Sequence, residues 1–258
     1  MKTKLFELLG ISEEKKNLLL LLNDGSKKKE TIMESLGISR QALVPHVTLL
    51  EQNGLITRQD DSYGLTGIGK ITVSEMIPFL ETLEFLDNNS SFLGNYNLDF
   101  IPPDLLERFH ELGSLKVKEP ALSEIHEPDK EFMSTVSTSF SLISTFMYPT
   151  FSDLTSKLMD RGTDVSVIIN KEIFEKLRRE RHDECKGLIE NENLRVYLYP
   201  EDLGFISFGL TDTCVMFRLF NMDNGFDNKT IMSCSPAAVE WGREFFESYL
   251  KRSTPVTD

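Results

Sequence analysis

The sequence lacks a long hydrophobic run. The longest stretch of consecutive apolar residues is the five leucines from Leu18 to Leu22, whereas a membrane-spanning helix needs about 20. No basic segment followed by an apolar core and a small-residue cleavage site stands at the start, so a secretory signal peptide is not expected. Together these absences predict a soluble, cytoplasmic protein that contacts no membrane.

Cysteine is scarce, with only Cys185, Cys214 and Cys234 in the chain. An odd number at wide spacing does not make a disulfide framework, so we expect unpaired thiols in a reducing compartment. Cys214 and Cys234 are expected to be small buried hydrophobes, with redox sensing as the alternative. Cys185 lies about one helical turn after His182, but two ligands do not complete a zinc site. Neither a metal nor an organic cofactor is expected.

Nucleotide-binding and hydrolase motifs are also missing. The sequence contains no Gly-x-Gly-x-x-Gly loop, no Gly-x-x-x-x-Gly-Lys-Ser/Thr loop and no Gly-x-Ser-x-Gly nucleophile elbow. The first two motifs bind phosphate through backbone amides, and the third exposes a catalytic serine. Their absence favours a binding protein over an enzyme.

The excess of acidic residues is unevenly distributed. Residues 1–75 contain ten Lys/Arg and ten Asp/Glu, so this segment is neutral, while the remaining 18 Lys/Arg and 31 Asp/Glu account for the net charge of −13. An acidic rear segment is repelled by phosphate and would leave one face of the neutral segment to meet nucleic acid. The alternative, of equal weight, is that the rear segment is simply an acidic cytoplasmic domain.

A glycine turn between two helical segments predicts a helix-turn-helix. Gly37 suits the left-handed residue that ends a helix, and Ser39 is a good N-cap for the next one. Leu43, Val47 and Leu50 then recur at i, i+4 and i+7, the spacing of one buried helical face. A second helix with an exposed polar face would lie in a DNA major groove. An ordinary helical hairpin is the alternative.

A short hairpin follows this second helix. Leu55–Arg58 has the composition of a strand, Asp60–Gly64 that of a turn, and Leu65–Thr66 that of a return strand. Upstream, we expect a helix over Ser12–Leu22 with Ser12 as its cap, and another opened by Lys27–Lys29. Helix, turn, helix and hairpin in this order, within about sixty residues, is the winged-helix arrangement.

Two sets of residues are candidates for contact with DNA. The groove-facing side of the second helix is predicted to consist of Arg40, Gln41, Val44, Pro45 and Thr48. Phosphate contacts are predicted for Lys27, Lys28, Arg58 and Lys70. Because proline costs a helix interior about 3 kcal/mol, the helix is expected either to kink at Pro45 or to begin later than Ser39. The acidic tip of Asp60 and Asp61 disfavours entry into a minor groove.

The rest of the chain alternates helices with strands. Thr66–Leu86 has a helical pattern that Pro78 bends or divides, and it either pairs with a second copy or packs on the rear domain. The all-polar run Asp87–Ser91 is the expected linker. Beyond it, a Ser- and Thr-rich helix is expected over Asp129–Phe146, and strands are expected over Leu115–Lys118, Val165–Ile169, Leu194–Tyr199, Phe205–Leu210, Cys214–Phe220 and Thr230–Ser233. This pattern indicates a mixed α/β domain, with domains over residues 1–75 and 93–258 joined by a helix and linker over 76–92.

The segment LGISRQALVPHVTLLEQNGLITRQDDSYGLTGIGK, residues 36–70, resembles the DNA-binding head of ArsR- or TrmB-type winged-helix regulators. Its strongest matches are L-x-x-x-G-L-I at Leu50–Ile56 and Y-x-L-T-x-x-G at Tyr63–Gly69. The whole chain resembles archaeal regulators of methanogens that join such a head to a methanogenesis-regulatory-protein sensor domain. The resemblance implies an α+β winged helix-turn-helix domain followed by an α/β, phospholipase-D-like domain, with the helix after the wing pairing in a dimer.

Active enzymes of the phospholipase-D-like fold carry His-x-Lys-x4-Asp. None of the four histidines here, at positions 46, 110, 126 and 182, is followed two residues later by lysine, so the rear domain is expected to lack this chemistry. Phe140, Phe146, Tyr148 and Phe151 are candidates for lining an effector pocket, with core packing as the alternative.

These patterns lead us to expect a sequence-specific, DNA-binding transcriptional regulator of the archaeal type. We expect it to bind double-stranded DNA as a homodimer and to respond to a small-molecule effector in the rear domain. The alternative is a protein-interaction adaptor whose winged helix binds a protein partner, which the neutral head and acidic tip permit. A degenerate phosphodiesterase-like enzyme is a third class, and no residue supports it.

Overall fold

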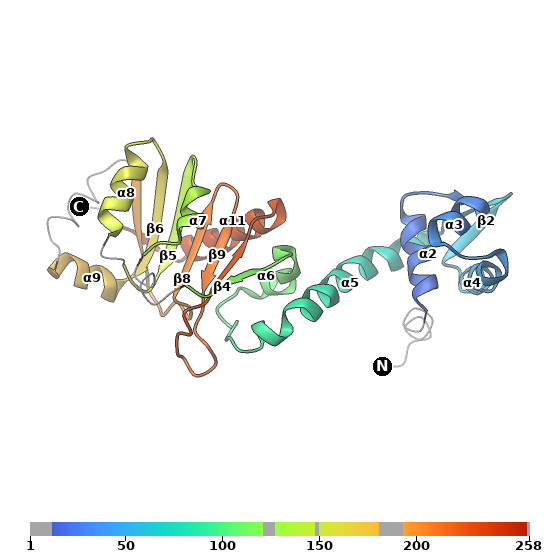
Figure 1. Ribbon diagram of the computed structural model, residues 1–258, viewed down its shortest axis with the longest axis horizontal. Helices are drawn as coiled ribbons and strands as arrows, with labels where there is room; N and C mark the ends of the chain where they lie inside the picture. Colours follow the sequence, from blue (N-terminus) through green and yellow to red (C-terminus); the bar gives the residue numbers. More distant parts are fainter. Residues whose placement is uncertain (1–11, 121–126, 148–149, 181–192, 257–258) are drawn as a thin grey trace. The chain divides into compact units, whose positions relative to one another are not determined.

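The computed structural model describes residues 12–120, 127–147, 150–180 and 193–256 (Figure 1). The chain divides into two compact units, Met1–Leu83 and Glu84–Asp258, called the N-terminal and C-terminal units below. Across the described ranges, no helix has both the length and the hydrophobicity that crossing a membrane requires.

Three helices with well-defined ends form most of the N-terminal unit. They are α2 (Glu13–Asn23), α3 (Lys29–Leu36) and α4 (Arg40–Gln52). The Ser12 hydroxyl accepts a hydrogen bond from the amide of Lys15 at the start of α2. In the same way, the Ser39 hydroxyl accepts from Ala42 at the start of α4. Gly37 has a φ of 63°, the left-handed backbone that ends α3. Both expected caps and the expected glycine turn are confirmed.

A three-stranded antiparallel sheet completes this unit. Its strands are β1 (Lys27–Lys28), β2 (Ile56–Gln59) and β3 (Ser62–Leu65), in the order β1-β3-β2. The expected hairpin is present, but its turn is only Asp60–Asp61, because Gln59 pairs with Ser62. The expectation that Lys27–Lys29 opens a helix is wrong for its first two residues. They form β1 because they pair with β3, whose other edge is already occupied by β2.

The helix α5 (Gly67–Leu93) begins where the Tyr63–Gly69 motif contacts the Leu50–Ile56 motif. The Thr66 hydroxyl accepts from the amide of Gly69 at 3.0 Å and lies 2.5 Å from the carbonyl oxygen of Gly54, to which it donates. A Cβ at position 69 would lie 1.9 Å from the carbonyl oxygen of Leu55. Only glycine therefore allows the first turn of α5 to lie this close to the start of the hairpin.

The same helix runs through two features, one of which was expected to bend or divide it and the other to end it. Pro78 lies inside α5, and the polar run 87–91, expected as a linker, is also helical. The Asn89 side chain donates to the carbonyl of Phe85 one turn earlier. Phe85 and Leu93, which flank the run at a spacing of eight residues, are both buried in a core of the C-terminal unit. Burial of these two side chains outweighs the weak helix propensity of Asn and Ser.

An eight-stranded mixed sheet forms the centre of the C-terminal unit. Its strands are β4 (Lys116–Lys118), β5 (Ser139–Ser144), β6 (Asp164–Asn170), β7 (Leu194–Tyr199), β8 (Ser207–Thr211), β9 (Val215–Arg218), β10 (Thr230–Ser233) and β11 (Thr254–Pro255). Their order is β11-β7-β6-β5-β8-β9-β10-β4. The β5–β6 and β6–β7 pairs are parallel and the other pairs are antiparallel. The expected mixed α/β architecture is thereby confirmed.

Helices cover both faces of this sheet (Figure 1). On one face lie α6 (Pro103–Glu107), the 3-10 helix η1 (Phe109–Leu112) and α11 (Pro236–Leu250); on the other lie α7 (Lys130–Ser134), α8 (Phe151–Met159) and α9 (Lys171–Glu180). The first layer buries an aromatic core in which Trp241 and Phe245 stack at 5.3 Å between ring centroids. The second buries Phe132 and Phe140. The C-terminal unit therefore has three layers, with the sheet in the middle.

The prediction of a helix over Asp129–Phe146 is wrong. Only Lys130–Ser134 is helical, and Ser139–Ser144 forms β5, which lies between β6 and β8 in the sheet. Phe140 and Leu142 alternate with serines along this strand, and both contribute to the core beneath α7 and α8. Pairing on two edges satisfies the backbone of a segment whose Ser and Thr residues are poor helix formers.

The expectation of unpaired thiols is also wrong for two of the three cysteines. Cys214 and Cys234 form a disulfide, with Sγ atoms 2.03 Å apart and Cα atoms 4.1 Å apart. The pairing of Ser233 with Val215 sets the register of β10 on β9, so the next residue of one strand and the preceding residue of the other lie opposite each other. Spacing along the chain does not show this, because the sheet brings the two cysteines together. Cys185 lies outside the described residues.

Candidate nucleic-acid interface

The exposed face of α4 carries the five residues predicted to meet the groove. Leu43, Val47 and Leu50 are buried, and at about 100° per residue they lie on one side of the helix. The predicted set falls on a separate arc of the helix and is exposed to solvent: Arg40, Gln41, Val44, Pro45 and Thr48. The separation of core and solvent faces on α4 therefore agrees with the sequence prediction.

Pro45 does not delay the start of this helix. α4 begins at Arg40 with Ser39 as its cap, and Pro45 lies inside it. Proline lacks the N–H that would donate to the carbonyl of Gln41, one turn earlier. Both residues are exposed, so water can hydrogen-bond to that carbonyl. Arg40 is thus the first residue of α4, and the first turn contains no acidic residue.

The predicted phosphate contacts Lys27 and Lys28 do not form one basic patch. They are consecutive residues of β1, so their side chains project from opposite faces of the sheet. Lys27 lies opposite Tyr63 of β3, which in turn lies opposite Arg58 of β2. Lys28 lies opposite Ser62 on the other face and is exposed.

Arg58 is held beside the acidic tip of the hairpin. Its Nε donates to the carbonyl of Asp60 at 2.9 Å, and its guanidinium carbon lies 5.8 Å from the centroid of the Tyr63 ring. Asp60 has a φ of 53°, one of the left-handed positions of the chain. The neighbouring Asp61 accepts from the amide of Lys29 through its carbonyl at 3.1 Å. The tip is therefore fastened to the start of α3.

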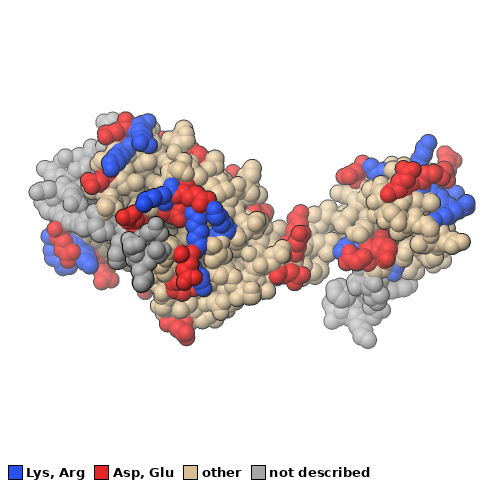
Figure 2. Space-filling model, viewed as in Figure 1, with Lys and Arg blue, Asp and Glu red and all other residues tan. Residues whose placement is uncertain are grey.

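The fourth predicted phosphate contact, Lys70, is exposed in the first turn of α5. Its backbone amide donates to the carbonyl of Thr66, the residue that links α5 to the hairpin. Basic and acidic side chains are interspersed over the visible face of the N-terminal unit (Figure 2). The exposed cations of this unit include Lys28, Arg40, Arg58 and Lys70, and residues 1–75 carry no net charge.

The predicted aromatic pocket of the C-terminal unit is largely core. Phe140 and Phe151 are buried, and Phe146 is half-buried. Phe140 and Phe151 border a cavity of about 20 Å³, which has room for about one water molecule. Tyr148 and the weak metal candidate of His182 and Cys185 lie outside the described residues.

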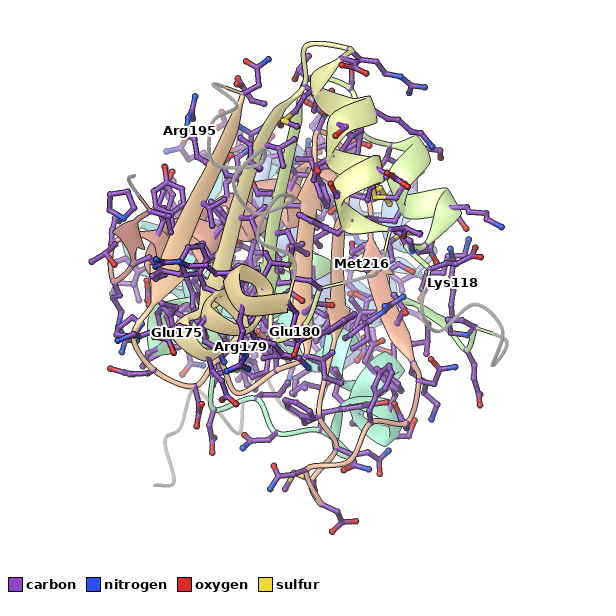
Figure 3. All side chains as sticks on the ribbon, turned by 90° about the vertical axis from the view of Figure 1, so that its left-hand side faces the viewer. Lys118, Glu175, Arg179, Glu180, Arg195 and Met216 are labelled. Atoms are coloured by element: carbon purple, nitrogen blue, oxygen red, sulfur yellow. A yellow bond between two sulfur atoms is a disulfide. The ribbon has the colours of Figure 1, made fainter. Side chains whose placement is uncertain are left out.

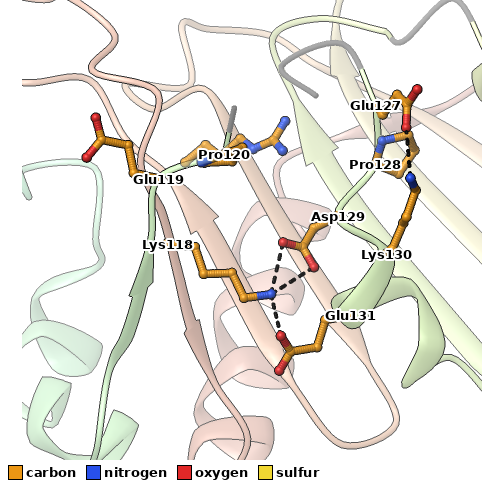
Figure 4. A pocket seen from close by; sticks show the side chains of 9 residues that line it. Lys118, Glu119, Pro120, Glu127, Pro128, Asp129, Lys130 and Glu131 are labelled. Carbon is orange, nitrogen blue, oxygen red and sulfur yellow. Dashed lines mark hydrogen bonds and ion pairs between the residues drawn. The ribbon is translucent and has the colours of Figure 1, made fainter. Parts of the chain in front are cut away.

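A charged pocket of about 460 Å³ lies instead beside β4 and the start of α7 (Figure 4). Its described charged lining consists of Lys118, Glu119, Glu127, Asp129, Lys130, Glu131 and Arg218. In the wider view, Lys118 lies on the edge strand β4, whereas Arg195 lies on β7, near the other edge of the sheet (Figure 3). Sequence reasoning missed this pocket. The signal was the single cation within the apolar run Cys214–Phe220.

Ion pairs organise the mouth of this pocket. Lys118 Nζ lies 3.1 Å from Asp129 and 2.6 Å from Glu131, and Lys116 Nζ lies 2.7 Å from Glu131. The Lys116 and Lys118 ammonium groups hold the pKa of Glu131 at about 2. Arg218 is only 3% exposed; burial lowers the pKa of its guanidinium, although the negative charge of Asp129 opposes the shift.

Two family models match the chain. The model for the N-terminal domain of methanogenesis regulatory protein FilR1 matches residues 3–84, and the model for the middle domain of the same protein matches residues 125–252. Among curated proteins, the methanogenesis regulatory protein FilR1 of Methanothrix harundinacea is 27% identical over 262 residues. That match covers 99% of this chain, which spans 58% of the length of the relative.

The chain also matches solved structures at low sequence identity. The archaeal chromatin protein TrmBL2 matches 99% of this chain and 100% of its own, at 15% identity and a TM-score of 0.45. The phospholipase D family member Nuc from Salmonella typhimurium matches 56% of this chain and 99% of its own, at 14% identity and a TM-score of 0.41.

Proposed function

We propose that this chain, which belongs to the family of the methanogenesis regulatory protein FilR1, is a DNA-binding regulator of transcription. The curated relative is named a regulatory protein, and both family models are described as domains of a protein with the same name. Because the chain spans only 58% of that relative, the role of the whole relative is carried over here as a proposal.

The observation that carries the proposal is the solvent face of α4. The helix is capped by Ser39, begins at Arg40 without an acidic residue in its first turn, and presents Arg40, Gln41 and Thr48 to solvent. Followed by the β2–β3 hairpin, α3 and α4 form a winged helix in which α4 is the recognition helix. Such a helix enters the major groove and contacts base edges with its N-terminal residues.

The other predicted contacts serve the DNA backbone. Lys28 and Lys70 are exposed at the starts of α3 and α5, where the positive end of a helix dipole adds to their charge. Arg58 is held near the tip by the carbonyl of Asp60, so it contacts phosphate rather than a base edge. Lys27 is half-buried on the other face of the sheet from Lys28 and is the weakest member of the predicted set.

A homodimer is part of the proposal, and its support is the apolar surface of α5. Five large hydrophobic residues of this helix are exposed: Ile68, Ile71, Phe79, Leu83 and Leu86. At about 100° per residue they fall within one third of the helix circumference, so they form a single stripe. A stripe of this kind marks a surface that associates with another protein. A second copy pairing through α5 would bring two recognition helices to adjacent half-sites.

Duplex DNA of random sequence tests the proposal directly. The full chain should bind it at low salt and release it as salt rises, because non-specific binding depends on phosphate contacts. In the Lys28→Ala/Lys70→Ala variant, the slope of log K against log salt should become shallower by about 1.8, at about 0.9 for each lost contact. The matched control is Lys157→Ala/Lys176→Ala, which removes two exposed lysines of the C-terminal unit and should leave the slope unchanged.

The acidic tip favours one second candidate function, a protein-interaction adaptor. Asp60 and Asp61 are exposed at the turn of the hairpin and would oppose phosphate rather than bind it. An absence of duplex DNA binding even at low salt would favour the adaptor and reject the proposed regulator.

A further inference from the structure

The disulfide between Cys214 and Cys234 joins the ends of two neighbouring strands. Cys214 precedes β9 and Cys234 follows β10. The pairing of Ser233 with Val215 places the two cysteines directly opposite each other. The residue after Cys234 is Ser235, the N-cap of α11. The bond therefore links the β8–β9 turn to the start of α11.

The two cysteines differ in their exposure to solvent. Cys214 is 2% exposed and packs in the core beneath α7 and α8, whereas Cys234 is exposed. The rate at which a thiolate attacks a disulfide depends on access to the sulfur that is attacked. The disulfide thus offers a reagent in solvent one accessible end, at Cys234.

Both sulfurs have a neighbouring group that stabilises the thiolate form. Cys234 immediately precedes the N-cap of a helix of 15 residues, and the positive end of the helix dipole favours negative charge there. At the other sulfur, the Thr213 hydroxyl lies 3.8 Å from Cys214 Sγ. A hydroxyl can donate a hydrogen bond to a thiolate, so it favours departure of Cys214 when the bond opens.

The backbone around each cysteine is held by contacts other than the disulfide. The amide of Cys214 donates to Thr211 Oγ1 at 3.1 Å, and its carbonyl accepts from the Thr211 amide at 2.9 Å. In the same turn, the Asp212 carboxylate accepts from the amides of residues 137–139. The strand that ends just before Cys234 is paired on both edges, with β9 and β4. The two thiols therefore stay close together after the bond opens, and the pair can close again without refolding.

We propose that Cys214–Cys234 is a thiol-exchange site that a dithiol reductant opens in the folded protein. One thiolate of the reductant attacks Cys234 Sγ and forms a mixed disulfide, while the bond to Cys214 breaks and Cys214 leaves as a thiolate that takes up a proton. The second thiolate then attacks the reductant sulfur of the mixed disulfide, and Cys234 leaves in the same way. The pair gains two electrons and two protons, which the reductant loses as it forms its own disulfide.

The setting in which this exchange takes place rests on the proposed function. A protein that binds chromosomal DNA works among reduced thiols, where protein disulfides are usually transient and act in catalysis or redox sensing. Opening the pair frees the start of α11 from the β8–β9 turn, so the stability of the C-terminal unit follows the thiol–disulfide balance around it. The exchange itself depends only on the disulfide and its neighbours.

The first test is the rate at which dithiothreitol reduces the folded full chain in the absence of DNA. The Cys185→Ser variant is used throughout, because it leaves only the two paired cysteines. Free thiols are counted from the gel shift that a polyethylene glycol maleimide produces. Direct attack predicts a rate proportional to the dithiothreitol concentration, which about 1 M urea changes by less than about 2-fold. A route through global unfolding would instead gain about 5-fold or more in about 1 M urea.

A monothiol identifies the sulfur that is attacked. Glutathione adds to that sulfur, and iodoacetamide then alkylates the one that leaves; peptide mass spectrometry should find glutathione on Cys234 and the alkyl group on Cys214. Cys214→Ser and Cys234→Ser, each in the Cys185→Ser background, are the matched pair of variants. The single thiol of the first should react with a maleimide at least about 10-fold faster than that of the second. Circular dichroism confirms that each variant is folded.

Three results would overturn the proposal. One is reduction only through unfolding, shown by the larger urea dependence, by a rate that stops rising with dithiothreitol, or by no reduction of the folded chain. Another is glutathione on Cys214, or equal maleimide rates for the two variants. The third is two free thiols in the chain after incubation with oxidised dithiothreitol. Because no DNA is present, these failures leave the DNA-binding function intact, and a failure of DNA binding leaves the exchange result intact.

Discussion

Replacing Arg40 and Arg58 with alanine, one at a time, separates base contact from phosphate contact. Arg40 is exposed as the first residue of α4. A bidentate arginine–guanine contact gives about 1–3 kcal/mol of discrimination, so Arg40→Ala should lower affinity for a specific site by about 5- to 150-fold. Affinity for a scrambled duplex should fall much less.

Arg58→Ala should behave differently because of where the guanidinium lies. It is held by the carbonyl of Asp60 and the ring of Tyr63, beside the acidic tip. From there it can neutralise one phosphate without reaching a base edge. The variant should therefore weaken specific and scrambled duplexes by the same factor, and the slope of log K against log salt should become shallower by about 1.

Fluorescence anisotropy with labelled specific and scrambled duplexes, across a salt series, measures both effects. Arg195→Ala is the matched control, because it removes one exposed arginine of the C-terminal unit. If Arg40→Ala and Arg58→Ala change both duplexes alike, Arg40 contacts phosphate and the assignment of the groove face fails. If neither variant changes DNA affinity, α4 is not the recognition helix.

Three further predictions concern assembly and stability. Phe79→Glu should convert the proposed dimer to a folded monomer in light scattering, because Phe79 lies on the apolar stripe of α5 and is 53% exposed; a dimer of unchanged stability would reject that interface. Asp212 has its carboxylate partly buried, which raises its pKa, but hydrogen bonds from Thr138 and the amides of residues 137–139 outweigh burial and hold the pKa at about 2. Asp212→Asn should therefore cost about 1–2 kcal/mol of unfolding free energy at neutral pH, and the difference from wild type should vanish as pH falls from about 4 through about 2; a difference independent of pH would contradict this. Reductant should lower the stability of the wild type by about 3 kcal/mol, the value for a cross-link 20 residues apart, and should not affect the Cys214→Ser/Cys234→Ser variant.

Local signals predicted most of the N-terminal unit. Ser39, Gly37 and the leucine spacing of α4 depend on contacts within a few residues, so they can be recognised without a tertiary structure. The strand at Lys27–Lys28 could not be recognised in this way, because β1 exists only through its pairing with β3 more than thirty residues later. The exposed residues of α4 were therefore predicted correctly, while the arrangement of the lysines around them was not.

The failures in the C-terminal unit share this origin. β5 lies within the Ser- and Thr-rich segment that was expected to be helical, and its structure is set by its pairing with β6 and β8. The Cys214–Cys234 disulfide likewise depends on the register of β9 and β10. Arg218 is a lone cation in an apolar strand, but only the fold brings it to the charged pocket together with Lys118 and Asp129.

The full chain is proposed to bind specific duplex sequences through α4. Repeated selection of bound molecules from a pool of random duplexes tests it most directly, with the wild type and Arg40→Ala selected in parallel. We expect the wild type to enrich an inverted repeat whose half-sites lie about 10 base pairs apart, and Arg40→Ala to lose preference at one position of each half-site. A wild-type pool that shows no enriched sequence after selection, or an identical motif from both proteins, would contradict sequence-specific binding through α4.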